Sequence, residues 1–168
     1  MRKFIEILPN EIVENPYNLI GRKWLLLTAG NEESFNTMTC SWGQTGVLWN
    51  KSVATVYVRP QRYTFGFMES NEYYTMSFFS EEYRGALNIC GTKSGKDANK
   101  VKLAGLTPVH VECYTYFEEA SLVLVCRKLY SQDMLSECFL DRGVDEENYS
   151  GDYHRQYVGE IVKVLLGR

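Results

Sequence analysis

The sequence has few of the residues that most often build metal sites or interrupt regular structure. It contains two histidines and four prolines among 168 residues. The five cysteines are widely spaced and form no C-x-x-C pair, which excludes the common zinc-ribbon and thioredoxin-type motifs. Two isolated histidines without a nearby carboxylate pattern give no basis for a metal site either. We therefore expect no metal centre.

Long apolar runs are missing as well. No run reaches the roughly 18 residues that a membrane-spanning helix requires. The N-terminal sequence MRKFIEILPNE lacks the apolar stretch of a signal peptide. The odd number of cysteines does not describe a disulfide framework. These absences together predict a reduced, cytoplasmic protein with no membrane partner.

Charge of one sign is not in large excess. The chain has 18 Lys and Arg residues and 21 Asp and Glu residues, for a net charge of −3 at pH 7. A nucleic-acid-binding domain usually carries a basic stripe, whereas the cationic residues here form two short clusters. Clusters of this size suit one small anionic ligand, and we expect no nucleic-acid partner.

Aromatic residues and short β-type runs are abundant. Aromatic residues make up 14% of the chain, and 12 of them are tyrosines. Strands are expected at residues 24–28, 36–42, 53–58, 73–79, 109–111, 113–117, 120–130 and 157–166. Helices are expected at 63–71 with Thr64 as its cap, at 80–90 with Ser80 as its N-cap, and at 98–103, and a loop at 141–152. Without regular alternation of strand and helix, this order predicts a mainly β fold, closed or sandwich-like, rather than a Rossmann fold.

The predicted strand Asn36–Trp42 is unusually polar for a buried strand. Its sequence, NTMTCSW, carries hydroxyl and soft side chains where a core strand would carry Val, Ile and Leu. Alternation places Asn36, Met38, Cys40 and Trp42 on one face and Thr37, Thr39 and Ser41 on the other. One interpretation is a half-exposed edge strand. The other is a surface that receives a flat ligand with a polar rim.

A cationic cluster follows the predicted strand at 53–58. Arg59, Arg62, Tyr63 and Thr64 lie just before a predicted helix, whose free N–H groups favour an anion. Arginine offers a planar fork of donors that suits phosphate. The structural alternative is a solvated, charged strand end.

The second cluster, Lys93-Ser94-Gly95-Lys96, is too short after Gly91 to satisfy the phosphate-loop pattern of nucleotide triphosphatases. A flexible surface loop is the structural alternative.

Four segments in the same order resemble the flavin reductase-like, flavoredoxin-type FMN-binding split-barrel family. They are NTMTCSW at 36–42, RPQRYT at 59–64, CGTKSGKD at 90–97 with Lys100 and AGLTP at 104–108, and His154 with YVGEIV at 157–162. The similarity spans roughly residues 20–165. It implies a Greek-key split β-barrel. The length of 168 residues predicts a single domain, 1–168, and Pro9 and Pro16 mark residues 1–21 as an N-terminal arm. The resemblance also implies a homodimer that binds FMN at the subunit interface.

The resemblance assigns roles residue by residue. It implies that Asn36, Thr37, Met38, Thr39, Cys40 and Ser41 line the flavin ring, partly through backbone groups. It also implies that Arg59, Arg62 and Thr64 hold the phosphate, with Tyr63 as a further donor or a ring contact, and that Lys93 and Ser94 lie near the phosphate. His154 is the one catalytic candidate, on the substrate side of the flavin, with a plain loop histidine as the alternative. Cys40 has either a redox role or the default role of a small buried side chain.

The function implied is an FMN-binding oxidoreductase. NADH or NADPH would donate the electrons, and free flavin, a metal complex or a redox protein partner would receive them. The alternative is a flavoredoxin-type electron carrier without a nicotinamide site. A relative of the pyridoxamine-phosphate oxidases, a haem-binding or sensing split-barrel protein and an interaction module without cofactor are further alternatives.

Overall fold

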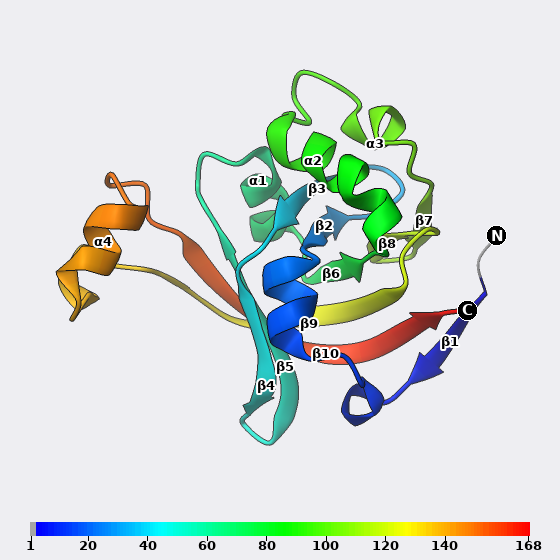
Figure 1. Ribbon diagram of the computed structural model, residues 1–168, viewed down its shortest axis with the longest axis horizontal. Helices are drawn as coiled ribbons and strands as arrows, with labels where there is room; N and C mark the ends of the chain where they lie inside the picture. The colour runs from blue at the N-terminus through cyan, green and yellow to red at the C-terminus, as the bar shows by residue number, and fades with distance from the viewer. Residues whose placement is uncertain (1–2) are drawn as a thin grey trace.

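The computed structural model describes residues 3–168, and within them the fold is dominated by one antiparallel sheet (Figure 1). The strands are β1 Phe4–Ile7, β2 Leu25–Gly30, β3 Phe35–Cys40, β4 Gly43–Leu48, β5 Lys51–Val58, β6 Tyr73–Phe78, β7 Pro108–Val111, β8 Tyr114–Phe117, β9 Leu122–Asp133 and β10 Arg155–Gly167. The helices are α1 Tyr63–Ser70, α2 Arg84–Thr92, α3 Lys100–Leu103 and α4 Arg142–Asn148, with short turns at Pro9–Glu11, Tyr17–Arg22, Glu81–Tyr83 and Ser136–Cys138.

The main sheet closes on itself. Its strand order is β3-β2-β6-β9-β10-β5-β4, with β1 added beside β10, while β7 and β8 form a separate hairpin. β3 and β4 stand at opposite ends of this order, yet only Ser41 and Trp42 separate them in sequence. The two edges must therefore meet, which bends the sheet into a barrel. The mainly β fold class predicted from the sequence is confirmed.

Strand alternation divides the core into two clusters. On β2, Leu25 and Leu27 face the barrel interior, where Met76 and Leu124 lie, whereas Leu26 faces the opposite side. Leu26 is completely buried there, in the cluster that includes Leu87 of α2. α2 thus covers the outer face of the sheet at β2, and it stands beside β3 as well.

One close approach explains the glycine of the YVGEIV segment. A Cβ atom on Gly159 would lie 2.6 Å from Tyr74 Oη. The Tyr74 hydroxyl donates a hydrogen bond to the Ala54 carbonyl at 2.8 Å, and Ala54 is the residue opposite Gly159 across the β5–β10 pair. Any larger residue would displace this buried tyrosine.

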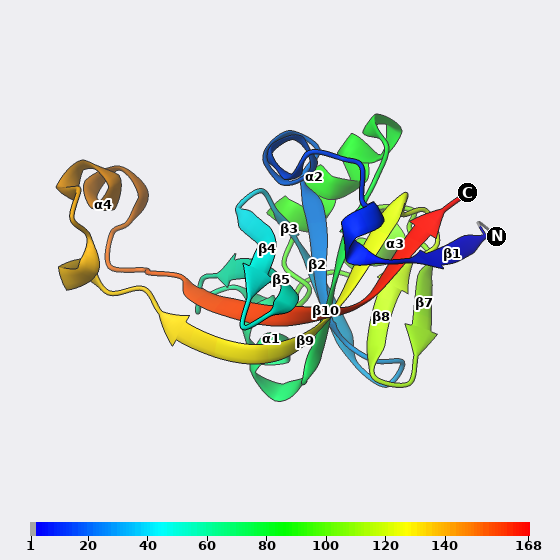
Figure 2. The same cartoon turned by 90° about the horizontal axis from the view of Figure 1, so that it is seen from below.

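β9 and β10 extend beyond the barrel and carry the segment 134–154, here called the arm. Figures 1 and 2 show α4 at the end of this extension, far from α2 and α3. The arm is internally bonded: the carboxylate of Asp145 accepts from Ser136 Oγ at 2.9 Å and from the Tyr153 hydroxyl at 2.7 Å. The prediction of a loop at 141–152 is therefore wrong, because these partners and the Asp141 cap on Gly143 N stabilise a short helix.

The capping of two helices also differs from expectation. α1 begins at Tyr63 as predicted, but Thr64 is not its cap; its hydroxyl accepts from Asn36 Nδ2 on β3. A 3₁₀ turn at 81–83 precedes α2, and the Ser80 hydroxyl bonds Glu82 instead of capping the helix.

The remaining expectations about the chain concern its ends. The expected N-terminal arm contains β1, which pairs with β10 from Phe4 opposite Gly167 to Ile7 opposite Val164. Residues 1 and 2, which belong to the expected domain and to the expected N-terminal arm, lie outside the described residues. Within residues 3–168, no helix combines the length and apolar character needed to cross a membrane.

Candidate functional site

β3 turns much of its predicted ligand surface toward the protein interior. Met38 and Cys40 are buried in the barrel core. Thr37 is fully buried, and its hydroxyl donates to the Leu27 carbonyl at 3.1 Å and accepts from Thr28 Oγ1 at 2.9 Å. The Thr39 hydroxyl donates to the Leu87 carbonyl of α2. None of these four residues lines any of the three cavities described below, whereas Asn36 and Ser41 on either side of them do.

Cys40 lies in surroundings that suppress thiol chemistry. Burial raises the pKa of its thiol to about 12, and the nearby Arg62 charge offsets only part of that effect. A thiol with such a pKa stays protonated at neutral pH and is a poor nucleophile. The environment therefore favours the role of a small core side chain over the redox role.

The start of β3 meets the two basic segments. Asn36 Nδ2 donates to Thr64 Oγ1 at 2.7 Å, and Gly95 packs so tightly that a Cβ there would lie 2.1 Å from Asn36 Oδ1. Arg62 Nη2 donates to the Gly91 carbonyl at 3.2 Å. The Lys96 ammonium lies 5.5 Å from the ring of Tyr63. Residues from β3, α1 and the loop after α2 thus converge.

A buried lysine completes this group. Lys100 is only 4% exposed, and its Nζ donates to the carbonyls of Cys90 and Lys93, each at 3.2 Å. Burial lowers the pKa of Lys100, and the charge of Arg62 acts in the same direction. The sequence identifies Lys100 only as part of a resembling segment, because nothing in the neighbouring sequence predicts that its side chain is buried.

The cations Arg62, Lys93, Lys96 and Lys100 are here called the cationic end. Within residues 3–168, none of them has a carboxylate partner in an ion pair. Two cavities lie beside them, of about 640 Å³ along Asn36 and Lys100 and about 490 Å³ along Arg62 and Lys96. Asp97 also lines the larger cavity, whereas Arg62 and Lys96 line the smaller one, which has no carboxylate in its lining. Positive charge next to open space of this kind is a site for an anion.

Arg59 does not belong to this group. Its guanidinium forms an ion pair with Asp152 and donates to the Asn148 carbonyl at 2.9 Å, both in the arm. It also lies 5.4 Å from the ring centroid of Tyr149. The sequence placed Arg59 and Arg62 in one anion site, but the structure does not bring them together: Arg59 faces the arm, and Arg62 faces α2.

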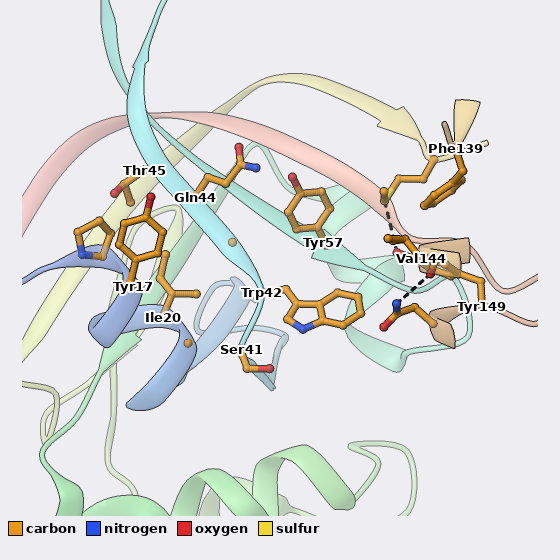
Figure 3. A pocket seen from close by; sticks show the side chains of 15 residues that line it. Tyr17, Ile20, Ser41, Trp42, Gln44, Thr45, Tyr57, Phe139, Val144 and Tyr149 are labelled. Atoms are coloured by element: carbon orange, nitrogen blue, oxygen red, sulfur yellow. Dashed lines mark hydrogen bonds between the residues drawn. The ribbon is translucent and has the colours of Figure 1, made fainter. Parts of the chain in front are cut away.

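At the other end of β3 a cleft of about 830 Å³ opens between the barrel and the arm (Figure 3). It is lined by Pro16, Tyr17, Ile20, Gly21, Ser41, Trp42, Gly43, Gln44, Thr45, Tyr57, Met134, Phe139, Val144, Asn148 and Tyr149. None of these residues carries a charged side chain. We call this space the aromatic cleft. In Figure 3, Trp42 and Tyr57 stand between a wall from the N-terminal segment, with Tyr17 and Ile20, and a wall from the arm.

His154 lies behind the aromatic cleft and does not line it. It is 8% exposed, its Nδ1 is 3.0 Å from the Tyr149 hydroxyl, and its ring lies 5.2 Å from that of Trp42. Burial, together with the charge of Arg59, lowers its pKa to about 4. The imidazole is therefore neutral at pH 7 and orients Tyr149 beside the cleft.

Sequence reasoning missed most of the cleft. Ser41 and Trp42 at the end of the polar strand were the signal, whereas Tyr57, Phe139 and Tyr149 gave none because they lie far apart in sequence.

The remaining candidates have ordinary surroundings. Ser94 accepts from the Lys96 amide at 3.2 Å within the basic loop. His110 lies in a strand, as expected, with its Nδ1 2.9 Å from Thr115 Oγ1. In the part of the chain that the structure describes, no group of three His, Cys, Asp or Glu side chains is arranged to hold a metal ion.

A family model described as "Flavin reductase like domain" matches residues 18–168. The chain belongs to the flavin reductase-like family. No curated protein sequence matches it.

Solved structures of this family share the fold. The FMN-binding domain of a flavin reductase-like enzyme from Shewanella baltica OS155 superposes with a TM-score of 0.70 at 14% identity, covering 98% of this chain and 78% of that one. Flavoredoxin from Methanosarcina acetivorans gives 0.68 at 20% identity, covering 96% and 74%. Nitrilotriacetate monooxygenase component B from Bacillus cereus gives 0.65 at 18% identity, covering 98% and 82%. The split-barrel fold predicted from the sequence is confirmed.

Proposed function

We propose that this flavin reductase-like protein is an FMN-binding oxidoreductase. The observation that carries the proposal is the pair of sites at the two ends of β3. An un-neutralised cationic end meets Asn36, and an uncharged aromatic cleft begins at Ser41. Five residue steps of nearly extended chain lead from Asn36 to Ser41, roughly 16 Å. An elongated ligand with an anionic end and a flat ring system, as FMN is, matches both ends.

The cationic end would hold the phosphate. Arg62 and Lys96 supply positive charge at the cavity, and Lys100 adds a buried charge behind them. Thr64 is buried and lines neither cavity, so its proposed part is to hold Asn36 in place through the hydrogen bond that its Oγ1 accepts. Tyr63, Lys93 and Ser94 remain part of this proposed site. Arg59 instead holds the arm, because its charge is already paired with Asp152.

The ring would lie along the end of β3, against the backbone near Ser41 and the side chain of Trp42. Buried Thr37, Met38 and Cys40, with Thr39 fixed to α2, keep that strand in place. When bound, FMN supplies the reversible electron chemistry, and the protein supplies position and surroundings. Neutral His154 and Tyr149 leave the substrate side of the site without net charge.

The electron donor is proposed to be NADH or NADPH. A specific observation also supports the alternative, a flavoredoxin-type electron carrier without a nicotinamide site. The aromatic cleft has no cationic side chain in its lining, whereas a 2′-phosphate is usually bound by one. A dinucleotide would therefore keep its phosphates outside the cleft. In the electron-carrier alternative, a redox protein donates the electrons instead.

We further propose a single domain that works as a homodimer in a reducing compartment such as the cytoplasm. All five cysteines are unpaired. Leu135 and Leu140 of the arm are exposed, Leu140 fully, as expected for side chains that a second copy covers. Gel filtration of the FMN-loaded protein should show a dimer, and dilution that gives monomers should also release FMN. Monomers that retain FMN would contradict a site shared between subunits.

The decisive experiment compares uptake of FMN and riboflavin. FMN should bind at least tenfold more tightly than riboflavin, and only FMN binding should weaken as salt rises, because the phosphate is the charged part. Equal affinity for the two flavins would remove the phosphate assignment. Bleaching of bound flavin by NADH or NADPH without oxygen would identify a reductase, and persistent flavin bands with both donors would favour the carrier.

A further inference from the structure

The aromatic cleft is uncharged over its whole lining, although 23% of the residues in the chain are charged. Its polar groups are neutral: the hydroxyls of Ser41 and Thr45, the amides of Gln44 and Asn148, and tyrosine hydroxyls. An anion entering such a space loses its hydration without gaining a cationic partner. The lining thus disfavours anionic ligands.

The charges nearest to the cleft are already compensated. Arg59 is bound by Asp152 and by the Asn148 carbonyl, so its guanidinium is not available to a ligand. His154 stands behind Trp42 and Tyr149 and is neutral at pH 7. Neither Arg59 nor His154 therefore offers the cleft an unpaired charge.

Aromatic rings face the cleft from both sides. Trp42 and Tyr57 come from the barrel, and Phe139 and Tyr149 come from the arm (Figure 3). The Tyr149 side chain is fixed, since its hydroxyl bonds His154 Nδ1 and lies 3.5 Å from the Met134 sulfur. Walls of this kind suit a flat ring, which gains contact with aromatic faces and edges at little entropic cost.

We propose that the aromatic cleft binds an uncharged planar aromatic compound of one or two rings, with Phe139 and Tyr149 of the arm as the residues that select it. This names the ligand class of the substrate side of the proposed flavin site, and it rests on the proposed function for the position of the flavin beside it. The binding itself depends on the cleft alone.

The test uses two naphthalene derivatives of nearly equal shape and different charge. 2-Acetylnaphthalene is neutral at pH 7.5 and 2-naphthoate is an anion, and their affinities for the FMN-loaded protein are measured by calorimetry. The neutral compound should bind at least tenfold more tightly. Equal or tighter binding of 2-naphthoate, or no binding of the neutral compound while FMN binds, overturns the proposal.

Variants locate the binding. Phe139→Ala and Tyr149→Ala should each weaken binding of 2-acetylnaphthalene to the FMN-saturated protein about tenfold. Leu140→Ala is the matched control, because Leu140 is on the same arm, fully exposed and outside the lining. An equal loss in Leu140→Ala, or no loss in the other two variants, overturns the assignment to the arm.

A variant that gains affinity tests the proposal without a substitution in the arm, and so without disturbing the folding of the arm. Gln44→Lys places a cation in the lining from an exposed position of β4 and should raise 2-naphthoate affinity at least tenfold. Val47→Lys, on the same strand but outside the lining, should leave it unchanged. No gain in Gln44→Lys overturns the proposal. Failure of FMN uptake with naphthalene binding retained would refute the proposed function and leave this inference standing.

Discussion

The cationic end and the aromatic cleft lie at opposite ends of β3 and differ in their charged groups. At the cationic end, the side chains of Arg62 and Lys100 donate, among residues 3–168, to backbone carbonyls, and Lys100 is buried with its pKa lowered. At the aromatic cleft, Arg59 is neutralised by Asp152, and the pKa of His154 is lowered until the ring is neutral. The cationic end therefore retains positive charge without a carboxylate partner. At the aromatic cleft, Arg59 is in an ion pair and His154 is uncharged at pH 7.

This difference concerns the free-energy cost of burying a cation that has no carboxylate partner. Burying Lys100 without a carboxylate partner is unfavourable in the free protein, as the lowered pKa indicates. A bound phosphate would restore the missing interaction. Arg59 instead makes its ion pair within the chain, so its charge stabilises the arm. Two arginines three positions apart thus have different partners, Asp152 for Arg59 and the Gly91 carbonyl for Arg62.

The largest expected effect separates those two arginines. Arg62→Ala should weaken FMN binding about 30- to 100-fold, because a charge-assisted hydrogen bond contributes about 1.5–3 kcal/mol. Arg59→Ala should change FMN affinity less than threefold. Fluorescence titration with FMN measures both. The reverse pattern would place the phosphate at Arg59 and end the division between the two regions.

The second effect concerns pH and the aromatic cleft. His154 has a folded-state pKa of about 4, below the ordinary 6.5, so between these values the unfolded chain binds a proton that the folded protein rejects. The free energy of unfolding should therefore fall by about 2 kcal/mol between pH 7.5 and pH 5 through this residue, and should not depend on it above pH 7.5. Urea unfolding of the wild type and His154→Asn measures the difference. An unchanged pH dependence in the variant would mean that His154 is not held neutral.

A smaller effect tests whether the arm serves only the cleft. Asp145→Asn weakens the bonds from Ser136 and Tyr153 that order the arm, at a cost of about 1 kcal/mol. Hydrogen exchange should accelerate within residues 142–153, and 2-acetylnaphthalene should bind about threefold to fivefold more weakly. FMN affinity should stay the same. The exposed Glu147→Gln on the same helix is the control, and a loss of FMN affinity in Asp145→Asn would show that the two regions are coupled.

The smallest effect is expected at Cys40, between the two regions. Its thiol is buried with a pKa of about 12, whereas Cys113 and Cys138 are exposed. Iodoacetamide should modify the two exposed cysteines in the native protein and leave Cys40 intact, as mass spectrometry of peptides would show. Rapid modification of Cys40 would revive its redox role.

The sequence predicted the elements with a local signal. Residues 53–58 and 73–79 have strand composition and form β5 and β6, and the helix at Tyr63 follows a cationic segment as expected. α4 was missed because an acidic, Gly-containing segment has weak helix propensity, and Asp145 gains its stabilising partners only after the arm folds.

By itself, the sequence determined the fold class, the family resemblance and the presence of a polar strand flanked by basic segments. These depend on composition and spacing, which are local. The tertiary structure decided which β3 side chains are buried, which arginine stays free of a carboxylate, and where aromatic side chains from the barrel and the arm meet. Alternation states which residues share a face, but only long-range packing determines which face is buried and which charges find partners.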